Sequence, residues 1–563
     1  MSSPKITSPA RLASHVFHAL GDYLHSIPDE HPLHIALRTY ALSLSLSLGP
    51  SLVPFVTSPR ARSGGLKALT NVLRRELGLS GFAFAITIGV GGGAALKQIW
   101  DTWNDQYEEV PQSKQWLSKL RRFSTGLSDA HRTFFSYMLS AYLAIVLLQS
   151  RKRLSKSAPP AAPIPMTAPL VDSASQRGKP SPTLDLTLLL LVRAVDSLIH
   201  ATCLPYVDSY DPNIPSETKE RVTKRRQQLT TRLDAFVFWA SSARIMWCFF
   251  YAPDRLPRSY NKWIMTLANI DPRILGALRA IRSRSWSYTK GFCDPPDLVT
   301  SFARDLGYPE NWGNPAMLPA YGGPEADRVW EELGLTGRHG VGGLPCEIVH
   351  GGLASSCTRN ASIRGLQAFA EAVAIYLPVH ILPILLTRPR KLLQTRQLIK
   401  TGLAVVRSAT FLSTFVSSIW YTVCLTRTLL LARLFPQISH DLWDGPYGCT
   451  FLGSLVCGGS IWIEQGRRRG EMSLYVLPRA IRAWLPHKWI NSGRASTRVV
   501  ERLTFVLSLA YLLTAASHSM HSLRGLSRWT LAFVMNGPNT GFWKRRRQDT
   551  TPPTPVQPPP THD

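Results

Sequence analysis

The sequence predicts an all-α, polytopic membrane protein, and three observations carry that prediction. The chain has 563 residues, of which 45% are hydrophobic, yet its mean hydropathy is close to zero, at −0.03. Its apolar residues are gathered in blocks, so the mean conceals stretches apolar enough to cross a bilayer. Its 64 Lys and Arg and 36 Asp and Glu lie mostly between these blocks. A soluble helical core would instead carry charges at helical spacing within them.

Eight stretches are candidate membrane spans, because about 20 mostly apolar residues are needed to cross the hydrocarbon. They are Thr39–Thr57, Gly78–Leu96, Thr133–Ser150, Ala235–Pro253, Ala372–Thr387, Ser408–Thr426, Gly445–Ile463 and Leu503–Leu523. Two further apolar segments, Leu186–Val192 and Met472–Leu485, adjoin or contain charges that are costly at a bilayer centre. We expect these two to be interfacial or re-entrant helices.

The order of these features predicts an internally duplicated bundle. Thr133-Phe134 begins a span that is followed by Gln-Ser-Arg-Lys-Arg, and Thr450-Phe451 begins one that is followed by Gln-Gly-Arg-Arg-Arg. A broken apolar segment with an Arg-Ala element comes next in each half. Basic loops follow the first and third spans of both halves, which gives the halves one orientation and an even number of crossings each. We therefore predict 4+4 spans.

The predicted organisation has five parts. They are an amphipathic or flexible segment over residues 1–30, a first membrane repeat over 31–253, a polar central region with a Cys/His motif over 254–371, a second membrane repeat over 372–545, and a disordered Pro-rich tail over 546–563. A basic patch for targeting or for anionic lipid headgroups precedes the tail and consists of Lys544, Arg545, Arg546 and Arg547.

The most specific passage lies where the central region meets the second repeat. Cys346-Glu-Ile-Val-His350 is followed by Ser-Cys357 and then by Tyr376-Leu-Pro-Val-His380. This succession resembles the cysteine-rich region of the transmembrane protein 135 family. The segment from Phe451 to Ala480 is similar to the domain that this family shares with the superfamily of mitochondrial inner-membrane translocase (Tim) and small peroxisomal membrane proteins. The resemblance covers residues 344–545 well and 31–290 weakly.

The resemblance implies an integral, multi-pass protein of the peroxisomal or mitochondrial membrane. It implies a part in organelle dynamics and in fatty-acid or sterol distribution, as a membrane scaffold or a lipid conduit, with membrane lipids as partners. Organelle-import or fission machinery and a second copy of the chain are further candidate partners. A secondary transporter, a channel or a translocase-like component is the alternative function.

Two function classes are not expected. The sequence shows no catalytic triad, phosphate-binding loop or dinucleotide fingerprint, so we do not expect an enzyme. The formal net charge of +28 invites a nucleic-acid interpretation. Much of that charge lies in matching loops of the two halves, where it records membrane orientation, so nucleic acid is not an expected partner.

Charged residues of the broken segments are candidates for lining a polar conduit or a lipid-headgroup site: Arg193, Asp196, Arg479 and Arg482. Ionisable groups at membrane depth usually face a partner or a wet cavity. Interfacial anchoring by long cationic side chains is the alternative interpretation.

Small residues at four-residue spacing predict close helix packing within two spans, since lipid supplies no hydrophobic drive between helices. They are Gly89 and Gly93 in one span and Gly453, Ser454, Cys457 and Gly458 in another.

Cys346, His350 and Cys357 are soft ligands that could bind zinc with a fourth partner such as His339. The spacing lacks the paired Cys-x-x-Cys of strong zinc sites, so no resident cofactor is expected. A Cys346–Cys357 disulfide in an oxidising compartment, or a packed turn that caps the next helix, are the alternatives. We expect His380 and the two histidines of the last span, His518 and His521, to be hydrogen-bonded structural residues rather than proton relays.

Overall fold

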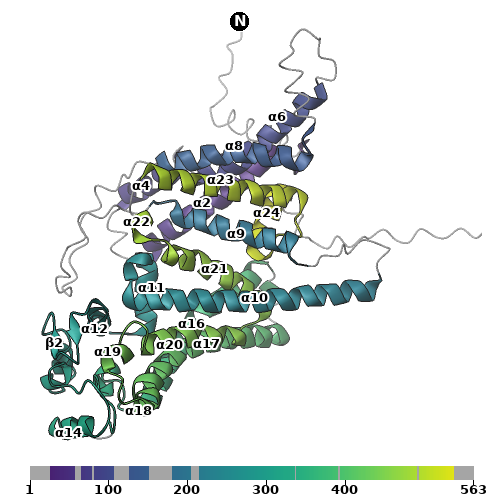
Figure 1. Cartoon of the computed structure of the whole chain (residues 1–563). Coiled ribbons are helices and arrows are strands. Elements are labelled where there is room, and N and C mark those ends of the chain that lie inside the picture. The colour runs from purple at the N-terminus through teal and green to yellow at the C-terminus, as the bar shows by residue number, and fades with distance from the viewer. Residues whose placement is uncertain are drawn as a thin grey trace, which may run out of the picture. The chain divides into compact units, whose positions relative to one another are not determined.

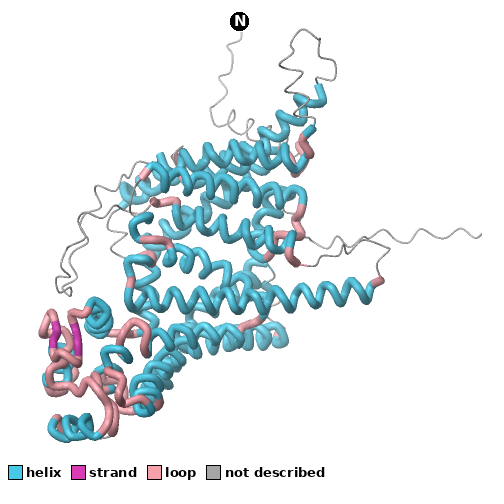
Figure 2. Tube along the Cα trace, viewed as in Figure 1, coloured by secondary structure: helices cyan, strands magenta, loops and turns pink. Residues whose placement is uncertain are grey.

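The computed structural model describes residues 26–57, 65–78, 81–106, 126–150, 181–204, 215–335, 338–387, 389–390, 394–490 and 494–537. Within these ranges the chain is helical apart from one two-stranded antiparallel hairpin, β1 (Trp286–Ser287) and β2 (Phe292–Cys293) (Figures 1 and 2). The chain divides into two compact units. Unit 1 comprises Met1–Thr167, Arg193–Ala201 and Arg502–Asp563, and unit 2 comprises Ala168–Val192 and Thr202–Glu501.

Unit 1 is built from helices alone in its described part. Its elements are α2 (Pro32–Thr57), α4 (Gly65–Leu77), α5 (Phe82–Thr87), the π-helical turn η1 (Ile88–Gly92), α6 (Gly93–Gln106), α8 (Asp129–Ser150), the second half of α9 (Leu184–Thr202), most of α23 (Ala495–His518) and α24 (Gly525–Asn536). The glycines of η1 let it pack directly on α2 and α8. A Cβ on Gly91 would lie 2.7 Å from that of Ala36, and a Cβ on Gly93 would overlap the Tyr137 ring.

The helical core of unit 2 is formed by long helices. They are α10 (Ser216–Tyr251), α16 (Cys357–Thr387), α17 (Thr395–Cys424) with its continuation through η5 (Leu425–Leu429) and α18 (Leu431–Leu434), α20 (Cys449–Cys457), η6 (Gly458–Ile463), α21 (Gly466–Trp484) and α22 (His487–Ile490). Helix α16 packs along α17, and α10 packs against α20 and α21 (Figure 1). Buried aromatic and aliphatic side chains of α10 and α17, such as Phe249 and Phe411, form one continuous core with those of α20 and α21.

The polar central region folds into short elements with a core of their own. They are η2 (Pro253–Arg255), α11 (Arg258–Ala268), α12 (Pro272–Ser283), the hairpin, α13 (Thr300–Asp305), η3 (Glu310–Gly313), α14 (Pro324–Glu332) and α15 (Cys346–Val349), joined by α19 (His440–Trp443) from later in the chain. Trp286, Phe302 and Trp330 are the largest members of this core. Helix α12 shows how the sequence sets a boundary: the Asp271 side chain accepts a hydrogen bond from the backbone N–H of Arg273, and Pro272 occupies the first turn.

Six helices in the described ranges are long and apolar enough to cross a membrane, which indicates a multi-pass membrane protein. They are Phe82–Asp105, Asp129–Ser150, Ser216–Tyr251, Cys357–Leu382, Thr395–Leu434 and Ala495–His518. Each contains or overlaps one of the eight predicted spans. Helix α2 covers the predicted span Thr39–Thr57 but is not among these six.

The prediction of a full span over Gly445–Ile463 is wrong. Its first four residues form a turn, and the apolar helix runs only from Cys449 to Ile463, which places it among the shorter apolar helices. Gly448 closes that turn, since a Cβ there would clash with the backbone of Trp443. The 4+4 arrangement stays a prediction.

Candidate functional site

Unit 2 contains a large, half-open apolar cavity of about 800 Å³. The start of α9, helices α10, α11, α16 and α17, and helix α21 form its wall, and nearly all of the lining side chains are aliphatic or aromatic. Ligand sites in proteins usually fall between about 300 and 1,000 Å³ and combine apolar walls with a few polar groups. The cavity is therefore large enough to hold a substantial apolar molecule.

Two helices on the cavity wall owe their position to local sequence features. Helix α11 is amphipathic: Ile264 is buried, while Tyr260 and Trp263 stack with ring centroids 5.8 Å apart and line the cavity. Helix α21 contains Pro478, which lacks a backbone N–H and so cannot complete the helical hydrogen-bond ladder there. Pro478 and the next residue, Arg479, both line the cavity.

Arg479 brings a cation to this apolar wall. Its guanidinium lies 3.9 Å from the ring centroid of Tyr475 and 5.4 Å from that of Tyr260, and it donates a hydrogen bond to the backbone oxygen of Tyr475. Within the described ranges Arg479 forms no ion pair with a carboxylate. Burial raises the pKa of Tyr260 to about 12 although the nearby Arg479 opposes the shift, so its phenol stays protonated at neutral pH.

Arg482, one turn further along α21, differs from Arg479. It is buried and binds Asp185 at the start of α9, with 2.5 Å between Nη1 and Oδ1. Asp185 also lines the cavity. This pair joins α21 to α9 and leaves the Arg482 charge with an internal partner.

The structure does not bring the four predicted headgroup residues into one site. Arg193 and Asp196 belong to unit 1, whereas Arg479 and Arg482 belong to unit 2. Asp196 accepts three hydrogen bonds from Arg524, at 2.6, 2.9 and 3.0 Å. The sequence does not indicate Arg524 as the partner of Asp196, because Arg524 lies more than 300 positions away and has no local feature that marks it.

The histidines of the predicted spans make hydrogen bonds. His380 is bonded to Arg468, which also donates to Ser408 at 3.0 Å. Ser408 in turn donates to the buried carboxylate of Glu464 at 2.7 Å. In unit 1 His518 lies 3.0 Å from the hydroxyl of Thr133.

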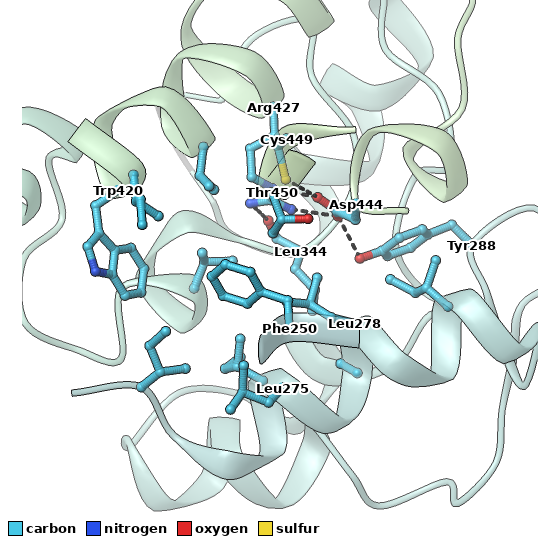
Figure 3. A pocket seen from close by; sticks show the side chains of 17 residues that line it. Phe250, Leu275, Leu278, Tyr288, Leu344, Trp420, Arg427, Asp444, Cys449 and Thr450 are labelled. Atoms are coloured by element: carbon cyan, nitrogen blue, oxygen red, sulfur yellow. Dashed lines mark hydrogen bonds and ion pairs between the residues drawn. The ribbon is translucent and has the colours of Figure 1, made fainter. Parts of the chain in front are cut away.

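A second, fully polar cluster lies at the end of α17 (Figure 3). Arg427 binds the carboxylate of Asp444 through two hydrogen bonds of 2.8 and 2.9 Å, and Tyr288 donates to the same carboxylate at 2.9 Å. Arg427 also donates to the backbone oxygen of Leu344 at 3.1 Å. Burial alone would raise the pKa of Asp444, but the Arg427 guanidinium holds it well below its usual range. The cluster fastens the central region to α17.

The predicted Cys346, His350 and Cys357 do come together, and all three are buried. One ligand atom from each lies within 4.8 Å of the others, with 3.9 Å between the sulfurs of Cys346 and Cys357. The hydrogen bond with Cys357 and burial raise the pKa of Cys346 to about 12. His339 is not the fourth member, because its side chain is 83% exposed and lies beside Asp327. Cys424 at the end of α17 lies beside the group, 3.3 Å from Nε2 of His350.

The small residues predicted for helix packing lie at contacts of their own units. A Cβ on Gly89 would lie 3.1 Å from that of Ala144 in α8. In the other span a Cβ on Gly453 would lie 3.3 Å from the backbone oxygen of Ile419, and one on Gly458 would lie 2.7 Å from the Trp239 ring. Ser454 and Cys457 are buried between them. The basic patch Lys544, Arg545, Arg546 and Arg547 lies outside the described residues.

No protein-family model, no curated protein and no solved structure matches the chain.

Proposed function

We propose that this chain is a multi-pass membrane protein that binds an acyl chain with an anionic head in the cavity of unit 2. The observation that carries the proposal is an almost wholly apolar wall with one cation, Arg479, that has no carboxylate partner in the described part of the chain. The acyl chain would fill the apolar space. Its carboxylate or phosphate would accept charge-assisted hydrogen bonds from the guanidinium.

Arg479 would determine which lipids bind in the cavity. A lipid that moves from the bilayer into the cavity exchanges one apolar surrounding for another, so its tail gains little free energy from the transfer. Selectivity between lipids would therefore come from the interaction of the head group with Arg479. A hydrogen bond to a charged group contributes about 1.5–3 kcal/mol, which corresponds to a preference of about tenfold to more than 100-fold for a lipid that can make it.

We further propose that this site serves fatty-acid or sterol distribution in a peroxisomal or mitochondrial membrane, as the resemblance to the transmembrane protein 135 family implies. The duplicated 4+4 bundle would then act as a membrane scaffold or a lipid conduit. Membrane lipids are the expected partners, and the proposal includes no catalytic step.

A secondary transporter or channel is the second candidate. Pro478 interrupts the hydrogen bonding of α21 beside Arg479, within the cavity wall. Interrupted helices beside a binding site are a feature of transporter folds.

The test uses the full-length protein in lipid nanodiscs with a photoreactive fatty acid, its methyl ester and a photoreactive sterol. We expect the acid to label peptides of α11 and α21. Arg479→Ala should weaken labelling by the acid about tenfold or more and leave labelling by the ester unchanged, because only the acid carries the charge. Arg396→Ala, at an exposed arginine of α17, is the matched control and should change neither.

Equal labelling by acid and ester, unaffected by Arg479→Ala, would contradict the proposal. Preferential labelling by the sterol would point to a different lipid class. Flux of a water-soluble solute through reconstituted protein that shows no lipid labelling would favour the transporter.

A further inference from the structure

Three buried side chains of unit 2, Cys346, His350 and Cys357, bring their ligand atoms within 4.8 Å of one another, and Cys424 lies beside this group, against His350. Cys346 opens α15, His350 follows its last residue, and Cys357 opens α16. Cys424 is the last residue of α17, 67 positions beyond Cys357. The three cysteines belong to one cluster of buried residues, and Nε2 of His350 lies against the sulfur of Cys424.

We propose that these four residues bind one structural zinc ion as a Cys₃His site. Three thiolates and one imidazole form a common ligand set of closed, four-coordinate zinc sites. The soft sulfur ligands favour zinc over magnesium or calcium, which take oxygen ligands. The inference is independent of lipid binding in the cavity.

Two ligand–ligand distances are close to those of a tetrahedral ion. Zinc–sulfur bonds of about 2.3 Å and zinc–nitrogen bonds of about 2.0–2.1 Å place two sulfurs about 3.8 Å apart and a sulfur and a nitrogen about 3.6 Å apart. The sulfurs of Cys346 and Cys357 are 3.9 Å apart, and Nε2 of His350 lies 3.3 Å from the sulfur of Cys424. The same sulfur pair is too far apart for a disulfide bond, whose length is about 2.05 Å.

The hydrogen bonds of His350 orient its ring so that Nε2 can bind a metal ion. Its other ring nitrogen, Nδ1, lies 2.7 Å from the backbone oxygen of Ala354 and donates to it. A backbone carbonyl in this position fixes the tautomer and the ring orientation of a zinc-bound histidine and leaves the Nε2 lone pair facing the ion. Arg364 donates to the backbone oxygen of His350 at 2.9 Å and holds the residue in place.

The charge of such a site would also be balanced. Zn²⁺ with three thiolates carries a net charge of −1. The buried guanidinium of Arg338 lies 3.6 Å from the sulfur of Cys346 and supplies one positive charge. Arg338 is held there by hydrogen bonds to the backbone oxygens of Leu344 and Gly342, at 2.8 and 2.7 Å.

The ion would join parts of the chain that are distant in sequence. It would tie α15 and the start of α16 to the end of α17, beside the Arg427–Asp444 pair that joins the same regions. Because a metal site forms only in the folded chain, its binding free energy would contribute to the stability of this junction.

The test measures zinc in the full-length protein, purified in detergent with a tag that lacks histidine. Inductively coupled plasma mass spectrometry should find about one zinc ion per chain, because a four-coordinate site holds one ion. A mercurial thiol reagent should release that zinc to a chromogenic chelator. Cobalt should replace it and give the intense visible absorption of a tetrahedral thiolate site. All three measurements use the wild-type chain and do not depend on a variant that folds.

Substitutions identify the ligands. Cys346→Ser and Cys424→Ser should each weaken zinc binding by more than about 100-fold, beyond the effect of losing a hydrogen-bond partner of a ligand. Cys248→Ser, at a buried cysteine of α10 outside the cluster, should retain about one zinc per chain. Wild-type protein without zinc even after reconstitution, or a Cys346–Cys357 disulfide found by peptide mapping, would overturn the proposal. Full zinc retention in Cys424→Ser would overturn the assignment of the fourth ligand.

Discussion

The cavity and the polar junction of unit 2 both adjoin α17, and they differ in how their charged side chains are placed: Arg427 and Asp444 are buried as a pair, whereas Arg479 is half-exposed. At the junction, Arg427 and Asp444 are 3% and 6% exposed, each satisfies the other, and the space beside them measures only about 60 Å³. In the cavity wall, Arg479 has no carboxylate partner among the described residues, and the space is about 800 Å³. A charge that the chain neutralises itself stabilises the fold. A cation such as Arg479, beside an apolar cavity, is available to a ligand.

The largest expected effect comes from breaking the junction. Asp444→Asn leaves the guanidinium of Arg427 buried without its counter-charge, which should lower the free energy of unfolding by about 3–5 kcal/mol. Thermal unfolding in detergent, followed by tryptophan fluorescence, measures this loss. The double variant Arg427→Met/Asp444→Leu should recover most of it, because well-packed apolar residues can replace a buried ion pair. Equal stability of wild type and Asp444→Asn would show that the pair does not hold the junction.

The pH dependence of the free energy of unfolding tests the role of Asp444 at the junction further. The folded-state pKa of Asp444 is depressed, so its contribution is fully present above the unfolded-state pKa of about 3.9 and is lost as pH falls below that value towards the folded-state pKa. One such group contributes a slope of about 1.4 kcal/mol per pH unit in that window. The stability difference between wild type and Asp444→Asn should therefore narrow between pH 4 and pH 2, approximately. A constant difference would contradict the assigned protonation state.

A smaller effect is expected from filling the cavity. Leu267→Trp adds volume at a half-buried lining residue, so it should weaken fatty-acid binding about tenfold while changing the free energy of unfolding by less than about 1.5 kcal/mol. Leu403→Trp is the matched control on α17, at a position that is 65% exposed and outside the lining. Saturation binding in nanodiscs measures the first quantity and thermal unfolding the second. Unchanged lipid binding in Leu267→Trp would show that the cavity is not the lipid-binding site.

Much of the helical architecture could be predicted from local sequence. Runs such as Thr133–Ser150 and Leu503–Leu523 are apolar over the length that a bilayer requires, and helices of the described chain cover or overlap them. The predicted span at Gly445–Ile463 was wrong because its glycines form a turn before the helix begins. Hydropathy counts apolar residues and does not detect where a backbone stops being helical.

The candidate sites were predictable only in part. The close spacing of Cys346, His350 and Cys357 is enough to indicate a cluster, since all three lie within twelve consecutive positions. Cys424 could not be identified in the same way, because a lone cysteine at the end of an apolar run resembles any packed residue. Arg427 likewise looks like an ordinary basic residue that flanks a span.

The sequence by itself determined that this is a helical chain with several membrane-length apolar segments, since length and hydropathy are local properties that each segment carries alone. Tertiary structure decided which charges are neutralised. In the folded chain Asp196 forms an ion pair with Arg524, Asp185 with Arg482, and Asp444 with Arg427. Arg479 lies at the cavity wall instead. The physical reason is that a buried charge is stabilised by a partner within a few ångströms, and the fold brings together residues that are 17 to more than 300 positions apart in the chain.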